Sequence, residues 1–425
     1  MSVSQDAGHD EFPPPFLAMA IVSLIAVSIP SIIIGRSVIG IELIIALLCI
    51  PFLNLRKECW HDIRSALSGP RILLLIAPAA LWLPGLMVSS DPLTSFTTEL
   101  RTLFYFIAGV ALWSVLRLHR SLPVLCLRIL IISSLFLTTI AVAGLLGLTE
   151  IVGFIRGDGW AEYNAYRYLK ETASSASILI PVIVYAAYRL RGPWISVAAI
   201  LVLELLAIIY LTASRSALAG VFGAAMTGLF LISLSSRKTK TLIIALVFIA
   251  IVVLGVFLLL QELQLGRWAY PGFQATMIPL WLIDAPRQAI WSYSWHAGEA
   301  HRWLGVGINV IDKLPGARDW NTVVGVRNIP LHPHSWIVEI LVETGVIGFV
   351  AMAGSIIYCT FAMVRGFLVS GNHAVLAALC VWAAYWTSGA FNFSYWSSWW
   401  LVSFIIAMAI CLASQKAGSK EHNPS

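Results

Sequence analysis

Residues 332–348 are HPHSWIVEILVETGVIG, a stretch that passes from two histidines into an apolar run continuing to residue 364. A helix needs about 20 predominantly apolar residues to cross the hydrocarbon core of a bilayer. The run is long enough, so we expect a membrane helix over 337–364, with His332 and His334 just before it. The stretch therefore places titratable groups where the chain enters a membrane.

The composition of the whole chain agrees with a membrane protein. The mean hydropathy is +0.86, 59% of the residues are hydrophobic and only 11% are charged, against roughly 25% charged residues in soluble domains. We expect an all-α polytopic membrane protein with about twelve transmembrane helices. The predicted helices lie near 14–35, 37–54, 71–89, 102–116, 122–148, 173–188, 194–212, 217–234, 241–262, 337–364, 373–391 and 397–414.

The distribution of lysine and arginine predicts which side of the membrane each loop faces. Short basic loops stay in the cytoplasm, and an even number of helices puts both chain ends on one side. With both ends inside, the inside segments hold 14 lysines and arginines and the short outside loops hold six. We therefore expect cytoplasmic termini. The polar N-terminus lacks the basic start and the cleavage site of a signal peptide, so 14–35 is kept as a helix.

The chain is interpreted as one integral membrane domain over residues 1–425, without an internal repeat. Its largest polar segment is the outer loop 263–335, which is far longer than an ordinary connection, so we expect it to have structure of its own. Within this loop Asp284 can cap a helix. Arg287, Trp291 and Trp295 would share one face of that helix, which we expect to lie along the membrane surface with its tryptophans in the headgroup layer.

Three outward features carry groups suited to a phosphorylated substrate: Arg215 in the turn TASRSALAG (212–220), Arg287, and His334 beside His332. Arginine binds phosphate bidentately, and a neutral histidine can accept a proton from an attacking hydroxyl. Together they predict a site for a diphosphate leaving group and a nucleophilic hydroxyl. The outer loops contain no close pair of carboxylates, and the six cysteines show no metal-ligand spacing, so we expect no metal and no other cofactor.

Each of these residues also has a simpler structural interpretation. Arg215 and Arg287 could contact lipid headgroups, as arginines at a membrane interface commonly do. His332 and His334 could cap or flank the helix that follows them. A carboxylate inside an apolar helix is costly unless it is paired, so Glu343 is interpreted first as the partner of a cationic or hydrogen-bonding group.

Three segments together resemble the region shared by the O-antigen ligase/polymerase superfamily, over about residues 205–350. HSWIVEILVETGVIG is similar to its H-N-x-x-L-x-x-x-x-E-x-G-x-x-G segment, and the matching residues are His334, Glu343, Gly345 and Gly348. TASRSALAG resembles its S-R-G-A turn. PRQAIWSYSWHAGEAHRWLGVGIN resembles its R-x-x-x-W and L-G-x-G elements, and the matching residues are Arg287, Trp291, Gly305 and Gly307. Ser335 and Val338 depart from the pattern, which usually has Asn and Leu at these positions.

The resemblance implies an inverting, metal-independent glycosyltransferase of GT-C-like architecture in a bacterial inner membrane. Such enzymes take glycan from undecaprenyl diphosphate on the periplasmic side. Carried over by position, His334 would be the general base, and Arg215 and Arg287 would bind the pyrophosphate. Supporting roles are assigned to His332, Ser335, Glu343, Arg156 and Lys170.

Within the superfamily we expect an O-antigen ligase, which transfers O-antigen polysaccharide to a sugar hydroxyl of lipid A-core in lipopolysaccharide biosynthesis. The alternatives are an O-antigen polymerase and a protein O-oligosaccharyltransferase; 425 residues leave little room for the soluble C-terminal domain often found in the latter. The alternative from a different class is a transporter of lipid-linked glycan. It is disfavoured because ionisable residues gather at the outer rim instead of the midplane. The expected partners are donor, acceptor and membrane lipids, and no nucleic acid.

Overall fold

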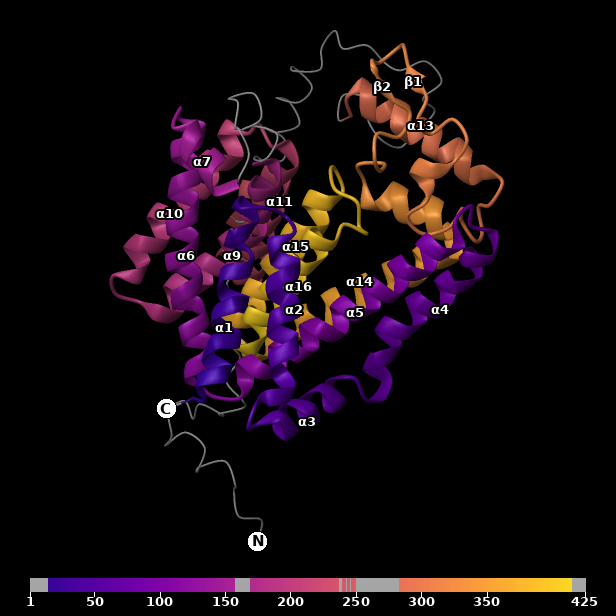
Figure 1. The fold of residues 1–425 in the computed structure, drawn as a ribbon. Helices are drawn as coiled ribbons and strands as arrows, with labels where there is room; N and C mark the ends of the chain where they lie inside the picture. Colours follow the sequence, from indigo (N-terminus) through magenta and orange to yellow (C-terminus); the bar gives the residue numbers. More distant parts are fainter. Residues whose placement is uncertain are drawn as a thin grey trace.

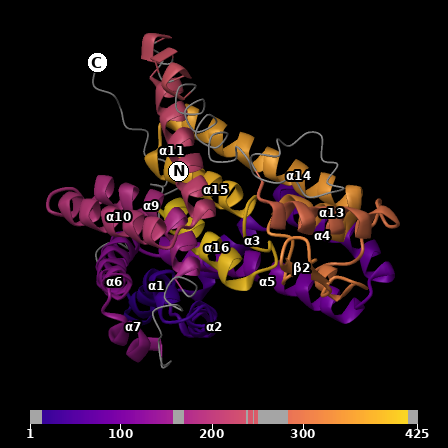
Figure 2. The same cartoon turned by 90° about the horizontal axis from the view of Figure 1, so that it is seen from above.

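The computed structural model describes residues 14–156, 169–236, 239–249 without positions 242 and 245, and 283–414. Within these residues the protein is all-α apart from one short antiparallel hairpin. Most helices form an upright bundle, and α4, α5 and α14 lean away from it beneath α13 and the hairpin (Figure 1). Seen from above, α13 and β2 lie over α4, α5 and α14, to one side of the bundle (Figure 2).

The N-terminal half forms the helices α1 (Phe16–Ser28), α2 (Val38–Cys49), α3 (Arg56–Ala66), α4 (Leu73–Val88), α5 (Pro92–Arg117), α6 (Ser121–Leu145), α7 (Thr149–Arg156) and α9 (Lys170–Leu190). Short 3-10 turns accompany them at η2 (Pro30–Ile33), η3 (Ile50–Phe52) and η4 (Gly69–Ile72). The C-terminal half forms α10 (Trp194–Leu211), α11 (Arg215–Ser235), α13 (Ala285–Glu299), η6 (Ile311–Lys313), β1 (Trp320–Asn321), β2 (Val326–Arg327), α14 (Trp336–Ser370), α15 (His373–Gly389) and α16 (Ser398–Ala413).

The number of full-length membrane spans is smaller than the sequence suggested. Six described helices are long and apolar enough to cross a membrane, and the bent pair α2–α3 would make a seventh. The expectation of about twelve is therefore wrong for the described residues. The predicted apolar segments do form α1, α4 and α16, but these have only 13, 16 and 16 residues. At 1.5 Å per residue they reach at most about 24 Å, less than the roughly 30 Å hydrocarbon core.

The predicted helix at 241–262 lies mostly outside the described residues. The polytopic, all-α class is confirmed by the helices that are described. Loops expected on opposite sides of the membrane lie at opposite ends of the molecule, since α3 is at one end and α7 and α13 are at the other (Figure 1). Which of these ends faces the cytoplasm stays a prediction.

Small residues bring α11 close to its neighbours in the bundle. A Cβ at Gly220 would lie 2.8 Å from the Ser177 hydroxyl of α9, and one at Gly223 would lie 2.5 Å from the Thr387 hydroxyl of α15. Membrane helices approach closely where such small residues line the interface. This packing places the start of α11, which carries Arg215, beside the loop that follows α15.

The described part of the outer loop, residues 283–335, has structure of its own, as expected. Ile290 and Trp291 of α13 pack with Val310 and Ile329 in a small hydrophobic core, which also includes Val342 of α14. The loop is fastened to the start of α5 as well. Lys313 Nζ lies 2.7 Å from Oδ2 of Asp91, and the Asp91 side chain accepts a hydrogen bond from the Thr94 backbone and so caps α5. The loop is therefore held against both α5 and α14.

Candidate active site

Helix α13 begins as the sequence predicts. Asp284 caps it by accepting a hydrogen bond from the backbone N–H of Arg287, at 3.1 Å. Trp291, however, is buried, and its indole Nε1 donates to the backbone oxygen of Pro333 at 2.8 Å. The expectation that Trp291 lies in the headgroup layer is wrong, because a buried indole N–H needs an acceptor and finds it in the protein. Trp291 thus ties α13 to the histidine segment.

The histidine segment forms a strained turn. His334 has a φ of 56°, in the left-handed region that residues other than glycine rarely adopt. Its backbone N–H donates to Nδ1 of His332 at 3.1 Å, and the two rings lie 4.3 Å apart. Several contacts thus hold the turn on both sides of Pro333. Strain that is maintained in this way is concentrated at functional sites.

The hydrogen bond to Nδ1 of His332 also indicates the protonation state of the His332 ring. Nδ1 can accept a hydrogen bond only when it carries no proton, so His332 is neutral in this arrangement. The geometry therefore suits His332 to orienting the backbone of His334.

The His334 ring is oriented by a residue that the sequence did not single out. The ring donates a hydrogen bond to the backbone carbonyl of Asn392, in the loop between α15 and α16. The Asn392 side chain in turn donates to the Ser216 hydroxyl at 2.9 Å, next to Arg215 at the start of α11. No sequence pattern indicates this contact, because every residue carries a backbone carbonyl. With one ring nitrogen engaged as donor, the other nitrogen of neutral His334 is an acceptor.

Both histidines are held in the neutral form. The pKa of His334 is lowered from 6.5 to about 4, first by burial and then by the positive charge of Arg287. The hydrogen bond to Asn392 and the charge of Asp284 partly oppose this shift. The pKa of His332 is lowered to about 3 by burial and by His334. Because the unfolded chain binds these protons more tightly, stability should fall as the pH drops from about 6.5 towards 4.

Arg287 and Lys170 lie near enough to His334 to lower the pKa of its ring. Arg287 Nη1 lies 3.0 Å from Asp284 Oδ2, and both side chains are half-buried. Lys170 is exposed at the start of α9, and its charge also lowers the pKa of His334. Arg215 is the exposed first residue of α11 and follows Ala213, whose φ of 49° confirms the predicted tight turn.

Two further candidates from the sequence are Ser335 and Arg156. Ser335 is buried, and its backbone carbonyl accepts from the N–H of Glu339 at 2.9 Å, in the first turn of α14. Arg156 is the last residue of α7. The side chain of Arg156 and the following residues 157–168 lie outside the described part of the chain.

Glu343 of α14 connects this helix to the outer loop through several hydrogen bonds. Its buried carboxylate accepts hydrogen bonds from the backbone N–H groups of Asn309, Val310 and Ile311, at 2.7, 3.1 and 3.1 Å. It accepts a fourth from the indole of Trp396. The interpretation of Glu343 as the partner of hydrogen-bonding groups is confirmed.

Helix α14 is broken beside Glu343, and the outer loop fills the break. Gly345 has a φ of 67°, so the helix hydrogen bonds are interrupted there. Loop N–H groups replace them: those of Val306 and Gly307 donate to the carbonyls of Val342 and Glu343, both at 3.1 Å. Backbone carbonyls at membrane depth need such partners.

The glycines that carry the resemblance make this junction possible. A Cβ at Gly305 would lie 2.2 Å from the Glu343 carbonyl oxygen, and one at Gly345 would lie 2.3 Å from the Trp303 carbonyl oxygen. Both positions also have a positive φ, which disfavours other residues. The glycine pattern is therefore explained by close backbone packing and needs no role in the chemistry.

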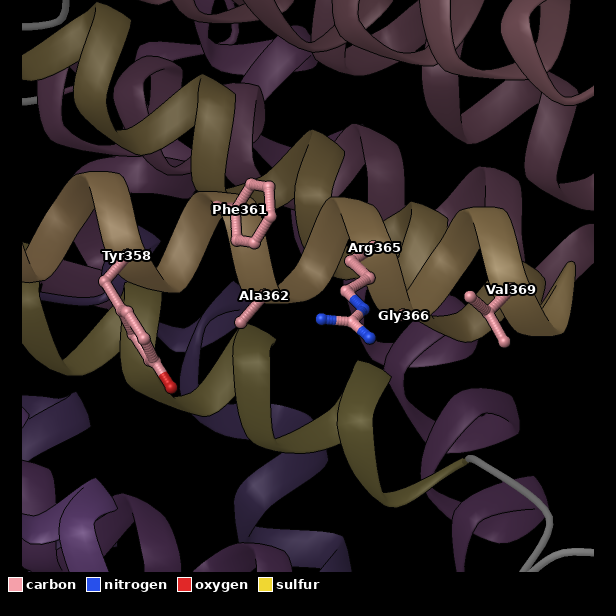
Figure 3. Close-up of a pocket in the computed structure, with 6 residues that line it drawn as sticks. All are labelled: Tyr358, Phe361, Ala362, Arg365, Gly366 and Val369. Atoms are coloured by element: carbon pink, nitrogen blue, oxygen red, sulfur yellow. The ribbon is translucent and has the colours of Figure 1, made fainter.

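Two hollows of about 480 Å³ on the described surface do not include His334. One follows a single face of the C-terminal half of α14, where Ala362 and Gly366 leave space between Tyr358 and Arg365 (Figure 3). The other lies between the end of α4 and α13, and is lined in part by Tyr293. Among the described residues, the candidate site is thus defined by hydrogen bonds and charges around His334.

The Lys170→Gln variant should show a shifted pH profile. Removing this positive charge is expected to raise the pKa of His334, because the charge opposes protonation of the ring. If activity requires neutral His334, the low-pH limb of kcat/KM moves to higher pH. A profile measured from about pH 4 to pH 7 checks this. A limb that stays in place would mean that Lys170 does not tune the ring.

Residues 197–353 match the family described as O-Antigen ligase. No curated protein matches the chain. The matched segment corresponds to the region of about 205–350 that carried the resemblance, and it contains Arg215, Arg287 and His334. Residues 197–353 of this integral membrane protein therefore form a domain of the O-antigen ligase family.

Proposed function

We propose that the protein is a glycosyltransferase of the O-antigen ligase/polymerase type and, within that type, an O-antigen ligase. It transfers O-antigen polysaccharide from undecaprenyl diphosphate to a sugar hydroxyl of lipid A-core, at the periplasmic face of a bacterial inner membrane. The observation that carries the proposal is His334, which is neutral, strained and oriented by Asn392, with Arg287 and Lys170 near its ring. The family match supports the reaction type.

In this proposal His334 is the general base. Its donor nitrogen is engaged by the Asn392 carbonyl, so the other nitrogen accepts the proton of the acceptor hydroxyl. The hydroxyl oxygen forms a bond to the anomeric carbon while the bond from that carbon to the diphosphate oxygen breaks. The proton goes to His334 and the bonding electron pair leaves with the diphosphate. Attack from the face opposite the leaving group inverts the anomeric carbon.

The cationic residues stabilise the departing diphosphate. Arg287 uses one donor for Asp284, which fixes the guanidinium and leaves other donors for phosphate oxygens. Arg215 stands at the start of α11, whose adjacent residue is linked through Asn392 to His334. Preorganised positive groups of this kind stabilise charge that develops in the transition state. Lys170 is assigned a supporting role.

The Arg287→Lys variant is expected to be impaired although it keeps its charge. Lysine lacks the planar fork that binds phosphate bidentately, and one lost hydrogen bond to a charged group costs roughly 10- to 100-fold in kcat/KM. Transfer assays with purified lipid-linked donor measure this. Arg318→Lys is the matched control, because Arg318 lies in the same outer loop but pairs with Asp312. Unimpaired turnover in Arg287→Lys would instead favour a lipid-headgroup contact.

Transfer is expected to persist in excess EDTA, because fixed arginines take the place that a divalent cation has in other enzymes with diphosphate donors. The measurement is glycan transfer by the purified protein before and after chelation. Activity that is lost with EDTA and restored only by a divalent cation would contradict this part of the proposal.

The function itself is tested in cells that lack the protein and are complemented with the wild type or His334→Ala. Lipopolysaccharide and the lipid-linked glycan pool are analysed together. A ligase deletion leaves bare core while long polymer accumulates on undecaprenyl diphosphate, and only the wild type restores the ladder. Core bearing a single repeat would identify a polymerase. An unchanged ladder would reject both and leave protein glycosylation or transport.

A further inference from the structure

Helix α3 lies across one end of the molecule. It is bent by 116° from the helix formed by α2 and η3, which precedes it. In Figure 1 it runs crosswise at the end opposite α13. A helix that turns by this angle after a membrane segment lies closer to the membrane plane than to its normal, which is the position of an interfacial helix.

One side of α3 is fixed to α5. Cys59 and Ile63 are buried, and the Ser114 hydroxyl of α5 donates to the Cys59 carbonyl at 3.1 Å. Asp62 lies 3.7 Å from the guanidinium of Arg117, at the end of α5. These contacts fix the rotation of α3 about its own axis, and therefore which of its side chains face outward.

The outward side of α3 carries a tryptophan among basic residues. Trp60 is 60% exposed. Arg56, Lys57 and Arg64 are exposed as well and lie three or four residues from Trp60, which places them on the same helix face. They are all the lysines and arginines of α3. Of the two acidic residues of α3, Glu58 lies on a different face and Asp62 pairs with Arg117 of α5.

We propose that this Trp60 face, formed by Arg56, Lys57, Trp60 and Arg64, binds the headgroups of anionic phospholipids. Indole side chains prefer the headgroup layer, and basic residues on an interfacial helix are attracted to anionic lipid. Phe52, at the end of η3 just before α3, is 75% exposed, so apolar surface suited to lipid continues up to this helix. A face with one aromatic among three positive charges fits a charged membrane surface better than an apolar protein groove.

This inference is independent of the proposed function, because its test measures bound lipid and not transfer. The full-length protein is purified in detergent with equal amounts of phosphatidylglycerol and phosphatidylcholine, and retained lipids are counted by native mass spectrometry. The wild type should retain the anionic lipid preferentially, and increasing salt should weaken this preference. The Arg56→Gln/Lys57→Gln/Arg64→Gln variant should lose it by about tenfold or more.

The matched control removes three positive charges from the opposite end of the molecule, as Arg302→Gln/Arg318→Gln/Arg327→Gln. It should retain anionic lipid like the wild type. An equal loss in both variants would mean that net charge alone attracts the lipid, and would overturn the assignment to α3. Equal retention of the two lipids by the wild type would also overturn it.

Discussion

The His334→Ala variant is expected to lose transfer activity by about 10²- to 10⁴-fold, the contribution of a well-placed general base. The ring is oriented by the Asn392 carbonyl and held neutral by its surroundings, so alanine removes the ring nitrogen that accepts the hydroxyl proton in the proposed reaction. The measurement is transfer by the purified protein from a lipid-linked donor to lipid A-core. The melting temperature is recorded in parallel, because alanine keeps the strained positive φ while the contacts of the ring are lost.

The matched control for this experiment is His296→Ala. His296 is an exposed histidine on α13, and its ring is bonded to the Ser292 carbonyl of its own helix. This variant should retain activity close to that of the wild type. If His334→Ala also remained near the wild-type rate while folded, the assignment of the base would have to be abandoned.

The Glu343→Ala variant is expected to be strongly destabilised, by roughly 3–5 kcal/mol, the typical cost of removing one partner from a buried charged network. The variant would leave the backbone N–H groups of Asn309, Val310 and Ile311 and the indole of Trp396 without their acceptor. Thermal or denaturant unfolding of the purified protein measures the loss.

Two further variants serve as controls for Glu343→Ala. Glu299→Ala removes an exposed carboxylate at the end of α13 and should change stability by less than about 0.5 kcal/mol. Glu343→Gln keeps one acceptor oxygen and should fall between alanine and the wild type. A stable Glu343→Ala protein would show that the outer loop does not depend on this anchor.

Much of the architecture can be predicted from local sequence patterns. Apolar segments such as 337–364 identify membrane helices because the hydrocarbon core excludes unpaired backbone groups. The Asp284 cap and the tight turn before Arg215 involve neighbouring residues only, and both are confirmed. The family segment could be recognised for a similar reason, since its motifs are short and contiguous.

The arrangement around His334 depends on contacts between segments distant in sequence. Asn392 orients the ring from the loop after α15, and Trp291 binds Pro333 across 42 residues of chain. Gly305 of the outer loop and Gly345 of α14 are also distant in sequence, and their lack of side chains allows the backbones of the loop and the helix to approach closely. Sequence patterns revealed which residue types were present, but not which carbonyl or N–H each would reach.

Composition and hydropathy alone therefore determined that this chain is a polytopic helical membrane protein with cationic and imidazole groups gathered on one predicted side. Tertiary packing decided which helices are full-length spans, that Trp291 serves the protein core instead of the headgroups, and that Glu343 anchors the outer loop. The physical reason is that hydropathy and capping act over a few neighbouring residues. Hydrogen bonds to buried carbonyls and N–H groups exist only once distant segments have packed together.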